Sequence, residues 1–194
     1  MAKDLIVIRN EGQTPIEDLS GLIPKIKTRE KLNALEFANI NKAKVKYLVT
    51  KPTKIRAGLT TGFLMAVHHD MLSEVWQWAG VPRKGSGKNI GVPAHHITAE
   101  IGRLIMDLDH WEKEGMPPLE IAVRIHHRLA WIHPFENGNG RWARLISDIY
   151  LHHQGLEIIE WPSDPKHVRE VFRPAYLTAL RAGDEGDIHP LLEL

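Results

Sequence analysis

The chain has 194 residues, of which 43% are hydrophobic and 25% charged, and this composition is typical of one soluble domain. Its formal net charge is only +1, so no direct binding to nucleic acid is expected. The absence of cysteine excludes disulfides, thiolate zinc sites and cysteine nucleophiles. No apolar run reaches the roughly 18 residues that cross a bilayer, so a cytoplasmic protein without a membrane span is expected.

Helical spacing of apolar residues dominates the chain after an irregular start. Residues 1–27 are interrupted by glycine and proline and are predicted to form an N-terminal arm. Helices are then predicted from Thr28 to just before Pro52, over 61–78, from Thr98 to Gly115, and over 119–132, 140–155 and 165–182. Residues 83–92 contain too much glycine for a helix and are expected to form a loop or a short hairpin. An all-α domain over residues 28–194 is therefore predicted.

The segment Asn137-Gly138-Asn139-Gly140 lies between two predicted helices, directly before the second one begins. Glycine lets backbone amides approach an anion, and a helix start adds unpaired amides and the positive end of the helix dipole. Arg141 and Arg144 lie one turn apart at that helix start and suit bidentate binding of phosphate. These features favour a polyphosphate ligand.

His133 ends the preceding helix, a few residues from the predicted anion site. A histidine there could act as a general base and take a proton from a hydroxyl that attacks a bound polyphosphate. From the residues alone, an equally weighted alternative remains open, in which the glycine-rich turn only joins two helices and His133 is a hydrogen-bonded buried residue.

The twelve residues 133–144 resemble the signature of the Fic family, His-Pro-Phe-x-(Asp/Glu)-Gly-Asn-Gly-Arg-x-x-Arg. Residues 68–80, 83–93 and 179–191 extend the resemblance, which is strongest to the bacterial branch called mobile mystery protein B. The resemblance implies a helical bundle with a β-hairpin flap. It also implies a protein adenylyltransferase, which transfers AMP from ATP to a hydroxyl side chain of a target protein.

The resemblance also implies a role for each motif position. His133 would be the general base, and the phosphates would be bound by Gly138, Asn139, Gly140 and Arg141, with Arg144 on the terminal phosphate. The flap would align the target backbone by strand addition, through Lys88, Asn89, Ile90 and Gly91.

Asn137 departs from the signature, because the family has a metal-binding Asp or Glu at this position. An amide oxygen can ligate Mg²⁺ or Mn²⁺ but brings no charge, so weaker metal binding or transfer of another phosphate-containing group is an open alternative. A second alternative is a non-catalytic module that binds a nucleotide or a partner, for instance an antitoxin in a toxin–antitoxin-like pair.

Glu36 is the candidate regulatory residue, on the predicted helix within 28–49. Many Fic proteins are inhibited by a glutamate that pairs with the second motif arginine, so the hypothesis is that Glu36 reaches Arg144. The alternative is an ordinary solvated charge. The paired histidines of the chain are poor chelates, which makes a zinc hydrolase a remote alternative, and Trp142 is a candidate for lining the nucleotide pocket.

Overall fold

The computed structural model describes residues 19–49, 59–85, 91–162 and 168–194. Its α-helices are α1 (Arg29–Lys44), α2 (Thr61–Leu72), α3 (Ile97–Lys113), α4 (Pro118–Ile132), α5 (Asn139–His153), α7 (Arg173–Asp184) and α8 (His189–Leu192). Short turns of other helix types are η1 (Val45–Val49), η2 (Ala94–His96) and η3 (Val168–Phe172). The described ranges contain no named strand, only an isolated bridge between Leu22 and Trp76, so the predicted all-α class is confirmed.

Most predicted helix boundaries agree with the structure, and Thr28 caps α1 as expected, its hydroxyl accepting from the amide of Lys31 at 3.3 Å. The helix predicted over 61–78 is the main exception, because α2 ends at Leu72. Val75 and Trp76 keep the helical spacing of apolar residues but are buried in a turn that follows the helix. The spacing of these apolar residues therefore could not distinguish a helix from a buried turn.

The last residues of the predicted arm pack against this turn. The amide of Ile23 donates to the carbonyl of Val75 at 2.9 Å, and the amide of Gln77 donates to the carbonyl of Gly21 at 2.8 Å. Residues 19–27 are therefore part of the folded domain, whereas residues 1–18 of the predicted arm lie outside the described residues.

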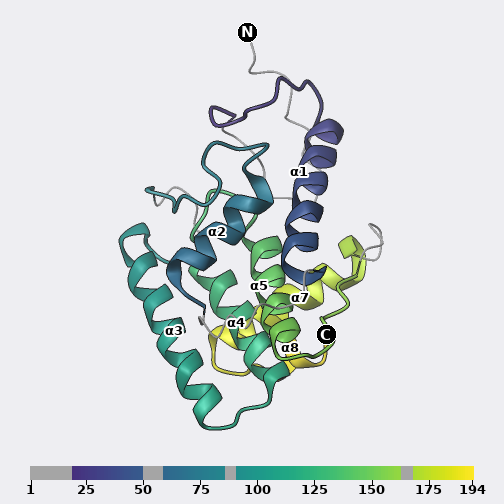
Figure 1. Cartoon of the computed structure of the whole chain (residues 1–194). Helices are drawn as coiled ribbons and strands as arrows, with labels where there is room; N and C mark the ends of the chain where they lie inside the picture. The colour runs from purple at the N-terminus through teal and green to yellow at the C-terminus, as the bar shows by residue number, and fades with distance from the viewer. Residues whose placement is uncertain (1–18, 50–58, 86–90, 163–167) are drawn as a thin grey trace.

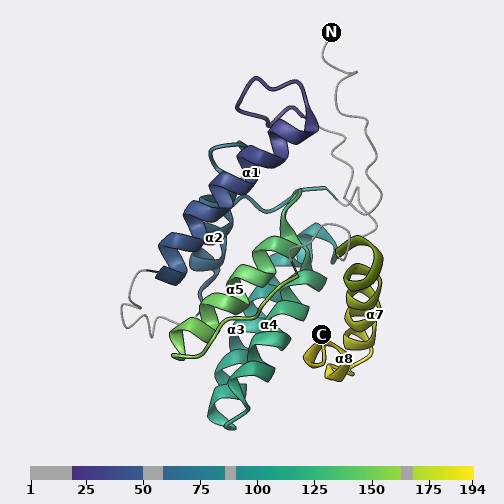
Figure 2. The same ribbon diagram turned by 90° about the vertical axis from the view of Figure 1, so that its right-hand side faces the viewer.

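Helices α4 and α5 pack along each other in the middle of the domain, as Figures 1 and 2 show. Helix α1 packs on α2 on one side of this pair, and α7 and α8 pack on α4 on the opposite side, which Figure 2 shows most clearly. Because α4 is covered by several helices, most of its apolar residues are fully buried, namely Ile121, Ala122, Ile125, Leu129 and Ile132. The α4–α5 connection, which carries the predicted site, is thereby attached to the most buried part of the fold.

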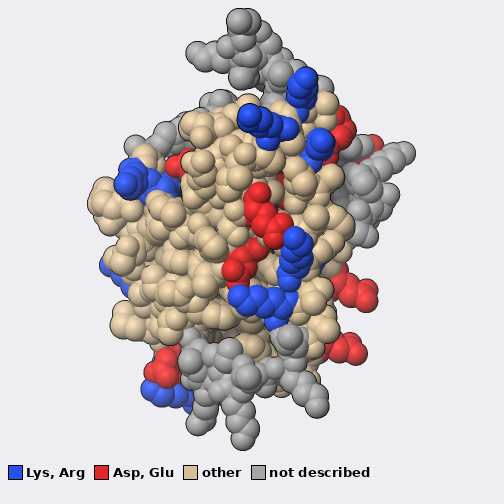
Figure 3. All heavy atoms as spheres, turned by 45° about the horizontal axis from the view of Figure 1, so that its top comes forward, with Lys and Arg blue, Asp and Glu red and all other residues tan. Residues whose placement is uncertain are grey.

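No helix among the described residues is long and apolar enough to span a membrane. On the face in Figure 3, acidic and basic side chains lie next to one another instead of forming a field of one sign. Lys42 pairs with Glu74 and Lys46 pairs with Asp70, which agrees with the near-zero net charge.

Candidate functional site

His133 has an unusual backbone conformation at the point where α4 ends. Its φ of 52° and ψ of 57° are left-handed, and no other non-glycine residue in the described ranges has a positive φ. A non-glycine residue in this region costs about 1–3 kcal/mol and persists only where the surrounding structure imposes it. Pro134 contributes to this, because a residue before proline is disfavoured from the right-handed helical region.

The contact of the His133 ring selects one tautomer of the neutral imidazole. Its Nδ1 lies 3.3 Å from the carbonyl oxygen of Ala130. Because a carbonyl only accepts, this contact is a hydrogen bond when Nδ1 carries the proton, and Nε2 is then the unprotonated nitrogen. A histidine in this tautomer can accept a proton at Nε2, as a general base must.

The rest of the connection is held by hydrogen bonds to its own backbone and to α2. The side chain of Asn139 accepts from the amide of Phe135 at 2.9 Å and donates to the carbonyl of Phe135 at 2.8 Å. The ring of His68 stacks on Phe135 at a centroid distance of 3.6 Å. Asn139 therefore shapes the loop with its side chain, and its backbone amide lies at the start of α5.

His68 also hydrogen-bonds at both ring nitrogens. Its Nδ1 accepts from the amide of Gly80 at 2.9 Å, so Nε2 carries the proton and donates to the carbonyl of Asn137 at 3.0 Å. Burial lowers the pKa of His68 to about 3, so the ring stays neutral at physiological pH. A neutral histidine of α2 thus supports the loop that the motif encodes.

The glycine-rich half of the loop has a backbone that requires glycine at one position and is open at another. Gly138 has a φ of +80°, and a Cβ there would lie 2.8 Å from Leu72 Cδ1, so both conformation and space require glycine. The amide of Trp142 donates to the carbonyl of Gly138, which leaves the amides of residues 139–141 ahead of the hydrogen-bond ladder of α5. A Cβ on Gly140 would meet no described atom within 4 Å, so this backbone is open to a ligand.

The two motif arginines point to different surroundings, and this corrects the predicted partner of Glu36. Glu36 Oε2 lies 2.7 Å from Nη1 of Arg141, not at Arg144, and Glu36 Oε1 accepts from the indole of Trp76 at 2.8 Å. Arg144 instead lies against three aromatic rings, those of Trp161, Phe172 and Tyr176, at 4.9–5.6 Å from their centroids. The two side chains can have different neighbours because residues three apart on a helix differ in direction by about 60°.

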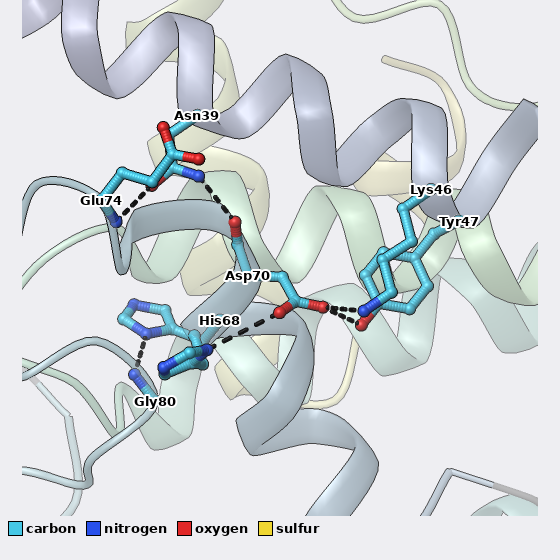
Figure 4. A network of polar contacts seen from close by, with 8 residues as sticks. Asn39, Lys46, Tyr47, His68, Asp70, Glu74 and Gly80 are labelled. Carbon is cyan, nitrogen blue, oxygen red and sulfur yellow. Dashed lines mark hydrogen bonds and ion pairs between the residues drawn. The ribbon is translucent and has the colours of Figure 1, made fainter.

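Helix α1, which carries Glu36, and the turn η1 that follows it are held on α2 by a network of polar contacts that is shown in Figure 4. Asn39 donates to the carbonyl of Asp70 at 2.9 Å and accepts from the amide of Glu74 at 3.0 Å. The Asp70 carboxylate accepts from Lys46 at 2.5 Å and from the hydroxyl of Tyr47 at 2.6 Å. Burial acts to raise the pKa of Asp70, but these hydrogen bonds outweigh it and the pKa is lowered, so the network contains a stable carboxylate.

Asn137 does not fit a metal held by the protein. Its Oδ1 accepts from the amide of Gly138 at 2.6 Å, and the oxygen is neutral. The described residues contain no cluster of three or more His, Cys, Asp or Glu side chains that could hold a metal ion. Because Mg²⁺ favours carboxylate and phosphate oxygens, the protein side of this position is a poor magnesium ligand.

The predicted flap is described only at its ends. Lys88, Asn89 and Ile90 lie outside the described residues, and no strand is seen in the described residues next to them. Gly91 is described, with a φ of +87°, and a Cβ there would lie 2.5 Å from the Cβ of His133. Gly91 therefore packs directly on the predicted base.

Sequence reasoning missed two residues that support this site. His68 fits the apolar stripe of its helix, so its spacing gave no sign of a loop contact. Arg83 is an isolated arginine in a glycine-rich segment, yet it is buried and donates to the carbonyl of His133 at 2.8 Å. Trp142, a candidate for the nucleotide pocket, is instead fully buried and donates to the carbonyl of Leu64, so it belongs to the core.

Fold and site together define a helical domain in which a histidine at the end of α4 is followed by a glycine-rich start of α5. Residues 58–151, which include the whole motif, match the model of the Fic/DOC family, so the chain carries a domain of the Fic/DOC family. The resemblance to the mobile mystery protein B branch stays a prediction.

Curated relatives and solved structures agree with this family. The chain is 29% identical over 138 residues to the protein adenylyltransferase Fic of Drosophila grimshawi, which covers 69% of this chain and 27% of the relative. It superposes on Fic-1 (residues 134–508) of C. elegans with a TM-score of 0.67 and 21% identity, covering 89% of this chain and 49% of that one. It superposes on BepC of Bartonella tribocorum, solved with bound AMPPNP, with a TM-score of 0.64 and 19% identity, covering 87% and 86%. The chain thus spans about a quarter of the curated relative and shares its fold with both structures.

Proposed function

We propose that this chain is a protein adenylyltransferase that transfers AMP from ATP to a hydroxyl side chain of a target protein. The observation that carries the proposal is the placement of His133 at the end of α4, in the connection that leads into the open start of α5, with its Nδ1 directed at a backbone carbonyl. The relative from Drosophila grimshawi, which is named a protein adenylyltransferase, and the AMPPNP bound to BepC support the same reaction.

In the proposed reaction, the amides at the start of α5 and the guanidinium of Arg141 bind the ATP phosphates. His133 Nε2 takes the proton of the target hydroxyl as its oxygen attacks the α-phosphorus. The bond between the α-phosphorus and the bridging oxygen breaks, and pyrophosphate leaves. Positioning and electrostatic stabilisation supply the catalysis. We propose the flap of residues 88–91 as the segment that aligns the target.

The proposed metal is Mg²⁺ or Mn²⁺. Because Asn137 is a poor ligand, we propose that the ion enters on the ATP phosphates and is held mainly by them. No protein residue of the described ranges is assigned to it.

We further propose that Glu36 restrains the site. Its carboxylate occupies Arg141, the arginine that would otherwise meet a phosphate. The Glu36 side chain is 4% exposed and the Arg141 side chain 40% exposed, so the arginine lies at the surface that ATP approaches while its partner is buried.

Incubation of the protein with α-labelled or γ-labelled ATP, with Mg²⁺ or Mn²⁺, tests the proposal through auto-modification. The expected result is covalent label from the α position only, which His133→Ala abolishes. Label from the γ position would indicate a phosphotransferase instead. Tight nucleotide binding without transfer in any metal would favour the binding module, for which the hydrogen bond between Asn137 and Gly138 is the supporting observation.

A further inference from the structure

We propose that Arg83 is a positioning residue that holds His133 in its left-handed conformation. This inference rests on the proposed role of His133 as the base. Arg83 acts on the backbone that carries the histidine, through the carbonyls of His133 and Pro134.

The first step of the argument is the hydrogen bonding of the helix end. A helix leaves its last carbonyls without partners inside the helix. Here three consecutive carbonyls are satisfied by residues of the two described stretches on either side of residues 86–90. The amide of Val92 donates to Ile132 at 3.4 Å, Arg83 Nε donates to His133 at 2.8 Å, and the amide of Arg83 donates to Pro134 at 2.8 Å.

The second step is that the same guanidinium joins the two described segments on either side of residues 86–90. Arg83 Nη1 donates to the carbonyl of Gly85 at 3.0 Å, and Nη2 donates to the carbonyl of Val92. The Arg83 residue is 7% exposed. The planar fork of arginine can direct donors at three carbonyls at once, which the ammonium of a lysine on a flexible stem cannot reproduce.

The third step is steric. Gly91 fills the space against the Cβ of His133 and also lies next to Arg83 Nη2. His133 is thus bounded by Gly91 on its side chain and by Arg83 on its carbonyl. The left-handed backbone of His133 is imposed by these neighbours and by Pro134.

The phosphate half of the loop has a separate support. His68 bonds the carbonyl of Asn137, and Asn139 bonds Phe135. Loss of the Arg83 fork is therefore expected to displace His133 while leaving the nucleotide site in place. If Arg83 only contributed to overall stability, its loss would affect the nucleotide site as much as the position of His133.

The decisive variant is Arg83→Lys in the full chain, with Arg128→Lys as the matched control, because Arg128 lies on α4 and pairs with Glu100 away from the loop. Arg83→Lys is expected to lower kcat for auto-modification on the order of 100-fold, since misplacement by about 1 Å has effects of this size, while the Kd for AMPPNP changes less than about twofold. Guanidinium ion, added at a concentration that does not unfold the protein, is expected to restore part of the kcat of Arg83→Ala and none of that of Arg83→Lys.

A measurement without catalysis separates this inference from the proposed function. The ¹³Cα and ¹³Cβ chemical shifts of His133 report its backbone conformation and are expected to move in Arg83→Lys but not in Arg128→Lys. If wild-type protein transfers nothing, the proposed function fails and the shifts still decide the role of Arg83. Unchanged His133 shifts, an equal loss of AMPPNP binding and kcat, or global unfolding of Arg83→Lys would each overturn the inference.

Discussion

The carboxylate of Glu36 lies 2.7 Å from the guanidinium of Arg141, 105 positions further along the chain. The same carboxylate accepts from the indole of Trp76, so a buried charge is satisfied on both oxygens. Two helices that are distant in sequence therefore meet at the first arginine of the motif.

Removal of this charge is expected to strengthen nucleotide binding. Glu36→Gln keeps an acceptor for Trp76 but releases Arg141, so the affinity for AMPPNP should rise about fivefold or more and auto-modification should increase. Titration calorimetry measures the affinity. Glu30→Gln, at the exposed first turn of the same helix, is the control and should change neither quantity. An unchanged affinity in Glu36→Gln would refute the restraint.

Substitution of Arg141 is expected to weaken nucleotide binding, whereas substitution of Arg144 is expected to lower the stability of the fold. Arg141→Gln, made in the Glu36→Gln background so that no buried carboxylate is left unpaired, should weaken AMPPNP binding about tenfold with little loss of stability. Arg144→Gln should lower the free energy of unfolding by about 2 kcal/mol, because Arg144 stacks on three aromatic rings. Urea unfolding and calorimetry distinguish them. A larger effect of Arg144→Gln on binding than of Arg141→Gln would contradict the assignment and favour its predicted role at the terminal phosphate.

Position 137 is expected to control the dependence on metal. Asn137→Asp keeps an oxygen that can accept from Gly138 and adds the negative charge that Mg²⁺ favours. The concentration of Mg²⁺ at half-maximal auto-modification should fall about tenfold. The same titration of Asn137→Ala, which lacks the oxygen, provides the comparison, and equal Mg²⁺ requirements in all three proteins would show that the position does not face the metal.

We expect the protein to lose stability in mild acid, because two of its histidines are buried and stay neutral in the folded state. Burial lowers the pKa of His68 and of His126 to about 3, from an ordinary value of 6.5. Between these values the unfolded chain binds protons that the folded chain does not, so the free energy of unfolding falls as pH falls below 6.5. Each histidine should cost about 2 kcal/mol between pH 8 and pH 5.

Asp148 acts in the opposite direction over part of this range. Burial raises the pKa of Asp148 to about 6, so as the pH falls the folded chain binds a proton before the unfolded chain does. The free energy of unfolding therefore rises as the pH falls through 6, by about 1 kcal/mol at pH 5. Urea unfolding at pH 8, 7, 6 and 5 measures the sum. His126→Gln should remove about 2 kcal/mol of the pH-dependent loss, whatever its effect at pH 8. A pH dependence identical to that of the wild type would show that His126 is not the buried neutral base described here.

Local sequence predicted much of the fold, because helical spacing, caps and breakers act within a few residues. Thr28 marked the start of α1, and Pro134 marked the end of α4. The end of α2 could not be predicted, since Val75 and Trp76 are apolar in the helical register but are buried by a turn that contacts residues 21–23.

The sequence by itself determined the loop from Gly138 to Arg141, because glycine conformation and a helix start are local properties of the backbone. Only the tertiary structure decided which arginine meets Glu36, that His68 supports the loop, and that Arg83 holds the backbone of His133. These three facts depend on contacts between segments more than thirty residues apart, and no local pattern encodes the direction in which packed helices present a side chain.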